Sequence, residues 1–474
     1  MSKNSAVYKQ LPAVSKLLDS DSLSDKIEEY GRQAVTESIR RILENYRKIL
    51  KTQSQEISEN QIIQSICDDI EKSNKNSLIK VVNASGVIIN TNLGRVPLSE
   101  KVFLEARDIA CAYNNLEFNL ETAKRGKRNT HLKNILCKLS GAEDALVVNN
   151  AAAAVLLCLN TFAKRKEVLV SRGELVEIGG SFRIPEIMKA AGCKMVEIGT
   201  TNKTKLSDYE NAISEKTAII FKAHQSNFVI KGFTEEVEVS ELAKLGKKYN
   251  LPVIYDNGSG LLEKSDFKAL KNQIDVKSSI KAGVVLVIFS GDKLFGGPQA
   301  GIILGKTSFI EKLEKNQLLR ALRIDKTTIA LLEASCKLYI NEKDLYKHNF
   351  IFKTLSQTQV ELKSKAEFLQ NSLKENKISS KIIPNKAMIG GGTNPESETE
   401  SFAVKILFNE KNKKQNSAIS AIVYKSLMKN HIPIIGILRK GELLFDIITC
   451  NENELTTISQ ALCQAMNNTS KKQK

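Results

Sequence analysis

Between residues 145 and 305 the chain alternates short runs of apolar, β-branched residues with stretches of helical spacing. These runs are nearly continuous in apolar residues, which indicates that both faces of the sheet are covered. Buried strands that alternate with helices predict an α/β domain built on a mostly parallel sheet. The expected strands are 145–149, 167–171, 194–199, 218–224, 252–256 and 284–290, and a strand at 301–305 is expected to return beside the last of them.

The parts on either side of this region have other patterns, and 474 residues are enough for two to four domains. Two apolar stripes at helical spacing predict a helical N-terminal domain over residues 1–70. A linker at 71–90 and a core domain at 91–335 follow. After a helical stretch at 319–340, a strand (402–408), a helix (417–428) and a hairpin turning at Lys440-Gly441 predict a small α+β domain at 336–474. The stripes are Val35, Ile39, Ile42, Leu43, Tyr46, Ile49 and Leu50, then Ile62, Ile63, Ile66 and Ile70.

Composition limits the location and the partners. No apolar run approaches the roughly 20 residues that span a bilayer, and residues 1–10 lack a signal-peptide core, so a cytoplasmic protein is expected. The eight cysteines form no CxxC pair, which argues against a metal site. The net charge of +17 fits a polyanionic partner such as nucleic acid, but abundant lysine throughout the chain explains it equally well.

The segment Ser290-Gly291-Asp292-Lys293 directly follows the expected strand 284–290. Open α/β sheets bind their ligands at the carboxyl ends of strands, so Lys293 is expected at such a site. A lysine there can form a Schiff base with an aldehyde cofactor, and the Ser290 hydroxyl is placed to help bind a phosphate. Alone the signal is weak, because a lysine after a strand is usually a plain surface residue.

Two further features strengthen the prediction that Lys293 forms a Schiff base. Asp256 ends the expected strand 252–256, where an aspartate can pair with the ring nitrogen of pyridoxal phosphate; an Asx-turn is its ordinary interpretation. Asn149-Asn150 precedes Ala151, the start of an alanine-rich helix whose free N–H groups can receive a phosphate. Phosphate loop, ring aspartate and Schiff-base lysine in this chain order predict pyridoxal 5′-phosphate, with Asn149, Asn150, Ala151, Asp256, Ser290 and Lys293 as cofactor-binding residues and Lys293 and Asp256 as catalytic ones.

Three arginines form a second group of candidates. Arg95 lies in the polar turn after the apolar run 87–89, and Arg320 and Arg323 are expected one turn apart on a single helix. Arginine binds phosphate-like oxyanions through two parallel hydrogen bonds, so these residues could form an anion site. Solvated or acid-paired arginines are the alternative, and the spacing does not decide between them.

These segments resemble the bacterial selenocysteine synthases, the L-seryl-tRNA(Sec) selenium transferase family, through nearly the whole chain. The most specific block is Ser290–Gly301 (SGDKLFGGPQAG). The other matching blocks are residues 11–18 (LPAVSKLL), 83–86 (NASG), 90–97, 113–117 (YNNLE), 124–126 (KRG), 199–202 (GTTN) and 226–227 (SN).

The resemblance implies a fold-type I pyridoxal-phosphate enzyme whose Schiff-base lysine is Lys293. Such an enzyme converts seryl-tRNA(Sec) to selenocysteinyl-tRNA(Sec) through a cofactor-bound aminoacrylyl group, with selenophosphate as the selenium donor. It also implies that Arg95, Arg320 and Arg323 hold the anion, that the N-terminal domain binds tRNA, and that the protein is a homodecameric ring of dimers.

The sequence departs from the family pattern at two positions. Ile448 stands where the family tends to have an arginine, and Ala123 replaces a glycine common before residues 124–126; the second change is expected to be minor. A carboxylate-binding arginine is dispensable when the substrate carboxylate is esterified to tRNA.

The rival hypothesis is a related lyase acting on a free small amino acid or amino-sugar acid phosphate, but such relatives lack the N-terminal domain. The roles of Arg125, Arg128, His131 and His224 stay open: the arginines could contact tRNA or cofactor, and the histidines could contact the cofactor ring or be structural.

Overall fold

The computed structural model describes residues 11–52, 57–178, 182–225, 228–390, 397–408 and 412–473. The chain forms two compact units, residues 1–80 and 81–474. Residues 1–10 of the expected N-terminal domain and the block at 226–227 lie outside the described residues.

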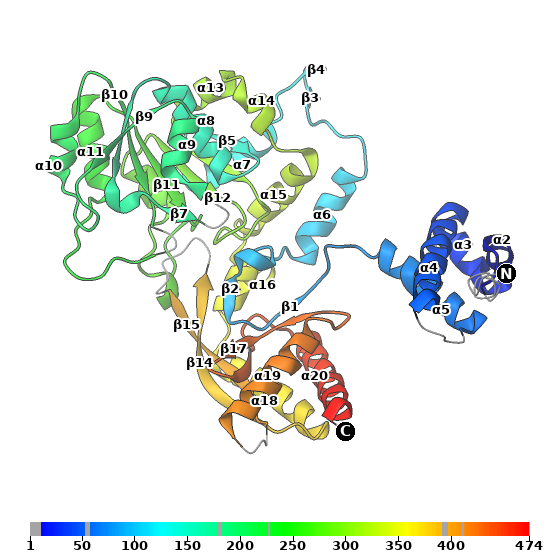
Figure 1. The fold of residues 1–474 in the computed structure, drawn as a ribbon. Helices are drawn as coiled ribbons and strands as arrows, with labels where there is room; N and C mark the ends of the chain where they lie inside the picture. Colours follow the sequence, from blue (N-terminus) through cyan, green and yellow to red (C-terminus); the bar gives the residue numbers. More distant parts are fainter. Residues whose placement is uncertain are drawn as a thin grey trace. The chain divides into compact units, whose positions relative to one another are not determined.

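The first unit is helical, as expected (Figure 1). Its longest helices pack through the two predicted stripes, because Val35, Ile39 and Leu43 on one helix and Ile62 and Ile66 on the other are almost fully buried. The last helix begins at a capping box formed by Ser58 and Gln61, and it continues four residues past the expected boundary at 70. The elements are α2 (Val14–Leu18), η1 (Asp21–Leu23), α3 (Ser24–Tyr30), α4 (Arg32–Thr52) and α5 (Glu59–Asn74).

The large sheet of the second unit has the strand order β5-β13-β12-β11-β10-β6-β9. Its neighbours are parallel except β13, which is antiparallel to both β12 and β5. The expected strands are all present within two residues of their predicted bounds, and the return strand is confirmed. They are β5 (Asp144–Val148), β6 (Glu167–Ser171), β9 (Lys194–Ile198), β10 (Thr217–Ala223), β11 (Val253–Gly258), β12 (Leu286–Ser290) and β13 (Gly301–Gly305).

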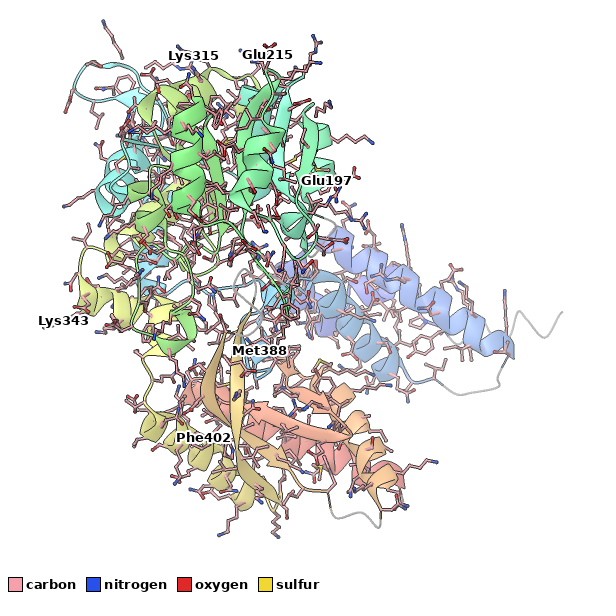
Figure 2. All side chains as sticks on the ribbon, turned by 90° about the vertical axis from the view of Figure 1, so that its left-hand side faces the viewer. Glu197, Glu215, Lys315, Lys343, Met388 and Phe402 are labelled. Carbon is pink, nitrogen blue, oxygen red and sulfur yellow. The ribbon has the colours of Figure 1, made fainter. Side chains whose placement is uncertain are left out.

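Helices cover both faces of this sheet and bury a separate apolar cluster on each (Figure 1). One face packs against α8 (Ala151–Ala163), α9 (Ile184–Ala190) and α13 (Thr307–Lys315). The other packs against α7 (Thr130–Ser140), α11 (Val239–Tyr249), α12 (Val276–Lys281) and α15 (Lys326–Leu338). Charged side chains stand outside these layers, such as Glu197 on the edge strand β9 and Lys315 at the end of α13 (Figure 2). The α/β fold class is thereby confirmed.

The small sheet of the second unit has the order β17-β18-β15-β14-β2 and packs against three helices. The predicted hairpin is present, but the long strand β14 was not predicted. The helices are α18 (Gln359–Glu375), α19 (Lys413–Leu427) and α20 (Glu452–Gln473), and the strands are β14 (Ser380–Gly390), β15 (Glu398–Ile406), β17 (Ile437–Arg439) and β18 (Glu442–Asp446).

The predicted linker at 71–90 is wrong over much of its length. Residues 71–74 belong to α5, β1 (Val82–Asn83) pairs with β16 (Ile434–Ile435), and β2 (Val87–Ile89) pairs with β14. The buried side chains of Val82, Ile88 and Ile89 join the core of the small sheet, and this burial is the physical reason why the segment is ordered.

The expected helix over 319–340 is also interrupted. Helix α14 (Leu318–Leu322) ends before Arg323, whose backbone is extended (φ −68°, ψ 146°). Asp325 then caps α15 by accepting hydrogen bonds from the N–H groups of Thr327 and Thr328. Arg320 and Arg323 therefore do not share one helix face.

Shorter elements connect these layers. They are η2 (Thr91–Leu93), α6 (Glu100–Ala110), β3 (Phe118–Asn119), β4 (Lys124–Arg125), η3 (Arg172–Glu174), β7 (Glu177–Ile178), β8 (Phe182–Arg183), α10 (Leu206–Ala212), η4 (Lys268–Leu270), α16 (Glu342–His348) and α17 (Phe350–Leu355).

Ala123, in the turn of the β3–β4 hairpin, has φ +51°. Glycine adopts this left-handed conformation at less cost, so the replacement is less minor than expected: it costs about 1 kcal/mol. No helix among the described residues is long and apolar enough to cross a membrane.

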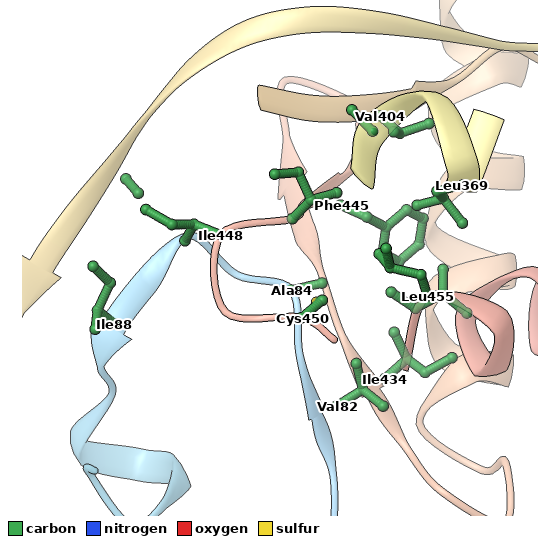
Figure 3. Packing of buried hydrophobic residues seen from close by; sticks show 14 of the residues in the cluster. Val82, Ala84, Ile88, Leu369, Val404, Ile434, Phe445, Ile448, Cys450 and Leu455 are labelled. Carbon is green, nitrogen blue, oxygen red and sulfur yellow. The ribbon is translucent and has the colours of Figure 1, made fainter. Parts of the chain in front are cut away.

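Ile448 is 2% exposed and belongs to the apolar core of the small sheet, together with Ile88 (Figure 3). The buried carboxylate of Asp446 holds the turn that presents it, by accepting hydrogen bonds from the Ile448 N–H (3.0 Å), Ser401 Oγ (2.8 Å) and Asn385 Nδ2 (2.6 Å). In this chain the position is part of the core, where an arginine would be a buried charge.

We expect Ile448→Arg to lower the free energy of unfolding by at least about 3 kcal/mol, because it removes apolar contacts and buries an unpaired charge. Urea unfolding followed by circular dichroism measures this. Ile422→Arg on α19, where the side chain is 50% exposed, is the matched control and should change stability by less than about 0.5 kcal/mol. Equal stability of the two variants would contradict the assignment of Ile448 to the core.

Candidate active site

Lys293 and Asp256 lie at the same edge of the large sheet. Lys293 follows β12 by three residues and is 5% exposed, while Asp256 lies in the adjacent parallel strand β11 and is 9% exposed. Burial lowers the pKa of Lys293, and the positive charge of Arg95 lowers it further, whereas Asp256 and Asp292 raise it. A buried lysine with a lowered pKa is a good nucleophile for a carbonyl group.

Asp256 is held in a strand that bulges between Asp256 and Gly258. The Gly258 N–H donates to its Oδ1 at 3.1 Å, so the Asx-type contact that sequence reasoning favoured for an ordinary aspartate is present. Burial raises the pKa of Asp256 to about 6, and the charge of Lys293 opposes that rise. A buried carboxylate that lacks a full counter-ion favours the approach of a protonated ring nitrogen.

The expected phosphate loop joins β5 to α8. The Asn150 side chain accepts a hydrogen bond from the Ala153 N–H at 2.8 Å, which caps the helix. The N–H groups of Ala151 and Ala152 belong to the first turn of α8, where backbone N–H groups have no partner within the helix and can bind a phosphate. Asn149 is fixed by a backbone hydrogen bond from its N–H to the Leu322 carbonyl at 2.9 Å, so the loop is anchored to the segment that carries Arg323.

Arg95 is already engaged in this site. Its Nη1 donates to both carboxylate oxygens of Asp292 at 2.8 Å, and Asp292 immediately precedes Lys293. Arg95 has φ +61°, an uncommon conformation for a residue with a side chain, and its N–H donates to the Asn90 carbonyl at 2.9 Å. Sequence reasoning did not assign a role to Asp292, although it lies within the quoted Ser290–Gly301 block.

Arg320 and Arg323 line a different pocket, of about 690 Å³, at the start of α7 and the end of α13. Arg125 and Arg128, whose roles the sequence left open, line it as well. Arg323 also pairs with Val148 of β5 through an isolated β-bridge. Arg320 on α14 and Arg323 in the extended segment after it therefore line the same pocket. Arg95 is not among the residues that line it. The acidic residue that holds the cluster, Glu117, was missed, although it ends the block 113–117.

The two histidines differ. The Nε2 of His131 lies 3.1 Å from the Leu116 carbonyl, which supports the structural interpretation for that residue. His224 follows β10, and its N–H donates to the Asp256 carbonyl at 2.9 Å. Its Nε2 is buried and has no hydrogen-bond partner. An imidazole nitrogen in this position, beside Asp256, is available to a bound ligand.

These residues fit pyridoxal phosphate: an amine, a carboxylate and an unpartnered imidazole nitrogen lie at the carboxyl ends of the adjacent strands β12, β11 and β10, and the start of α8 follows β5 in the same sheet. Among the described residues, no group of three or more His, Cys, Asp or Glu could hold a metal ion.

Comparison with known proteins decides the family. The model for L-seryl-tRNA selenium transferase matches residues 81–451, and the model for the N-terminal part of selenocysteine synthase matches residues 8–47. The chain belongs to the L-seryl-tRNA selenium transferase family.

Individual relatives agree with this assignment. The L-seryl-tRNA(Sec) selenium transferase of Aquifex aeolicus is 43% identical over 462 residues, covering 96% of this chain and 98% of the relative. That of Alkaliphilus oremlandii is 41% identical over 463 residues, with the same coverage. Pyridoxal phosphate is therefore the cofactor of this transferase, as predicted.

A solved structure supports the fold. The D-glucosaminate-6-phosphate ammonia-lyase structure superimposes with a TM-score of 0.60 at 20% identity, covering 84% of this chain and 98% of that one. The fold-type I architecture expected for a selenium transferase is thereby confirmed.

His224 provides a pH-dependent test of the site. Burial lowers the pKa of its imidazole to about 4; the charge of Glu236 opposes this shift, and the charges of Lys293 and Lys222 act in the same direction as burial. The unfolded chain, with a histidine pKa of about 6.5, binds the proton first as the pH falls, so the stability that neutral His224 provides is complete above about pH 6.5 and is lost toward pH 4. Between pH 7.5 and pH 4.5 the free energy of unfolding should fall in both proteins. We expect the fall to be about 2 kcal/mol smaller in His224→Gln than in the parent. Urea unfolding of both proteins at the two pH values measures this, and parallel losses would contradict it.

Proposed function

We propose that this chain catalyses the reaction for which its family is named. Seryl-tRNA(Sec) becomes selenocysteinyl-tRNA(Sec), and the predicted selenium donor is selenophosphate. In the overall exchange the seryl hydroxyl is replaced by a selenol and the phosphoryl group of the donor leaves as phosphate. The observation that carries the proposal is the match of both the catalytic unit and the separate helical unit to this family.

Pyridoxal phosphate supplies a ring that stabilises negative charge on the α-carbon of an attached amino acid. Lys293 is proposed to hold the cofactor and then to remove the seryl α-proton. Because burial and the charge of Arg95 lower its pKa, more of the neutral amine is available to accept that proton. Asp256 is proposed to keep the ring nitrogen protonated, and Ser290, Asn149, Asn150 and Ala151 to bind the phosphate group.

The proposed site for the anionic donor includes Arg320 and Arg323. Their pocket carries six basic residues (Arg125, Lys127, Arg128, Lys315, Arg320 and Arg323) and three acidic ones (Glu117, Glu311 and Glu314), so it favours anions. Arg95 is proposed as the third ligand, acting next to Lys293, where Asp292 balances its charge in the free protein. The core position of Ile448 agrees with a substrate whose carboxylate is esterified, because such a substrate needs no arginine there.

The helical unit is proposed to bind tRNA. Arg40, Arg47 and Lys51 on α4 are exposed and have no acidic partner among the described residues, whereas Arg41 is paired with Asp69. Unpaired basic side chains along one helix can contact a phosphate backbone.

Removal of residues 1–80 is expected to weaken tRNA(Sec) binding by at least about 100-fold and to leave the cofactor absorbance unchanged, because the catalytic unit keeps its own cores. Filter binding and absorbance spectra measure the two quantities. Arg40→Gln, Arg47→Gln and Lys51→Gln combined should lower the slope of log affinity against log salt by about 2 to 3. An unchanged slope, or unchanged affinity after truncation, would contradict this assignment.

The working protein is proposed to be a cytoplasmic homo-oligomer, a ring of dimers with ten copies. Large apolar side chains on α6 and in the segment that follows it are exposed in the single chain, and exposed apolar groups of this kind commonly mark an interface. They are Phe103 (58%), Leu104 (42%), Ile109 (46%), Tyr113 (107%), Phe118 (47%) and Leu120 (72%). Mass photometry of the purified protein tests the copy number.

The alternative function is a lyase reaction on a free amino acid or amino-sugar acid phosphate. Selenocysteinyl-tRNA formation from purified seryl-tRNA(Sec) and selenophosphate decides between them. Turnover of free substrates with none on charged tRNA would favour the lyase.

A further inference from the structure

Glu117 lines the pocket that Arg320 and Arg323 also line, and it contacts three of the pocket's arginines. Its Oε1 accepts hydrogen bonds from Arg128 Nε (3.2 Å) and Nη2 (3.0 Å), and its Oε2 accepts one from Arg125 Nη2 (3.0 Å). Arg323 Nη1 lies 3.5 Å from the same Oε1. The guanidinium groups of Arg128 and Arg125 hold the pKa of Glu117 below its usual range, so the carboxylate is charged at neutral pH.

The carboxylate connects segments that are far apart in sequence. Arg128, which Glu117 binds with two hydrogen bonds, also donates through Nη1 to the Ile324 carbonyl at 2.5 Å. The extended segment at 322–324 is in turn bonded to the end of β5 through Asn149 and Val148. Glu117 and Arg128 therefore fix the backbone that presents Arg323 at the cofactor end of the sheet.

Arg320, the other arginine of this pocket, has no contact of this kind. It is exposed and has no acidic partner among the described residues. The side chain of Glu117 is 29% exposed and those of Arg128 and Arg323 are 21% and 38% exposed, so this network is partly shielded from solvent. Partial burial makes the geometry of a charged hydrogen bond matter more than it does at an open surface.

We propose that Glu117 is the positioning residue for the anionic donor: it holds Arg323 and Arg128 in the orientation that binds the donor. This inference rests on the proposed anion site. It has an unusual consequence, since a carboxylate in an anion site repels its ligand through charge alone. If Glu117 positions the arginines, removal of its charge should weaken binding of the anion. If it only repels the anion, removal of its charge should strengthen binding.

The test is titration of the full-length holoenzyme with inorganic phosphate by calorimetry; the cofactor phosphate is already bound. Glu117→Gln, which keeps the shape and removes the charge, should weaken phosphate binding about 5- to 10-fold, because the two arginines lose their fixed orientation. Glu311→Gln is the matched control: it removes the same charge from the rim of the same pocket, where Glu311 is exposed and has no described arginine contact. That variant should bind phosphate equally or slightly more tightly.

A double-mutant cycle identifies the route of the effect. If Glu117 acts through Arg323, Glu117→Gln should change phosphate affinity by less than about 2-fold in an Arg323→Gln background. Glu117→Asp keeps the charge and should recover part of the affinity. In steady state, Glu117→Gln should raise KM for selenophosphate more than it lowers kcat, and the cofactor spectrum and melting temperature should stay close to those of the parent.

Each outcome has a distinct meaning. Tighter phosphate binding by Glu117→Gln, or an equal loss with and without Arg323, would overturn the positioning role. If Arg323→Gln alone leaves phosphate affinity unchanged, the proposed anion site itself fails, whatever Glu117 does.

Discussion

Lys293→Ala is expected to lower the rate of selenocysteinyl-tRNA formation by at least about 10³-fold, because this one side chain is proposed to supply both the link to the cofactor and the base for the α-proton. The variant should also lose the absorbance band of the lysine-bound cofactor.

Lys293→Arg is the matched control for this prediction. It keeps the positive charge beside Asp256 and Asp292 but cannot form the Schiff base, so it should be as inactive as the alanine variant and more stable. Single-turnover assays with labelled seryl-tRNA measure the rate. Substantial activity in either variant would contradict the role of Lys293.

Asp256→Asn is expected to have the next largest effect, a loss of about 10²- to 10³-fold in rate with the cofactor still bound. Asparagine occupies the same space and can keep the contact with the Gly258 N–H, but it cannot balance a protonated ring nitrogen. The absorbance band should therefore remain, with a shifted maximum, while the rate falls.

Single-turnover rates and absorbance spectra of the same sample separate these two effects. Asn257→Asp would place a carboxylate one residue along β11 and should not rescue Asp256→Asn, because the Asn257 side chain is engaged elsewhere: it donates to the Ile274 carbonyl and accepts from the Ser259 hydroxyl and the Gly260 N–H. A fully active Asp256→Asn variant would show that ring protonation does not depend on this residue.

The sequence was sufficient to predict the edge of the sheet where the candidate site residues Lys293 and Asp256 lie. Continuous apolar runs locate buried strands, and in a parallel sheet the residues that follow them meet at one edge. That reasoning predicted that Lys293 and Asp256 lie at one edge, and the structure places them there after the adjacent strands β12 and β11. The small sheet was harder, because β14 is half-exposed and includes Pro384, Asn385 and Lys386, so it has no apolar run to reveal it.

Helical spacing in the sequence did not predict how the arginine pocket is built. Helical spacing over 319–340 predicted one helix, yet Asp325, a strong N-cap residue, signals a new helix start that was overlooked. The contacts of Glu117 with Arg323 and of Arg95 with Asp292 join residues 206 and 197 positions apart. Such pairs depend on tertiary packing, which spacing along the chain does not encode. Likewise, β1 and β2 are too short to show alternation and are fixed by partners near the other end of the chain.

The most direct test of the central claim is to reduce the purified holoenzyme with borohydride and to locate the pyridoxyl group by peptide mass spectrometry. The account predicts a single modified peptide that contains Ser290-Gly291-Asp292-Lys293, with the added mass on Lys293. Label on another lysine, with Lys293 unmodified, would contradict it.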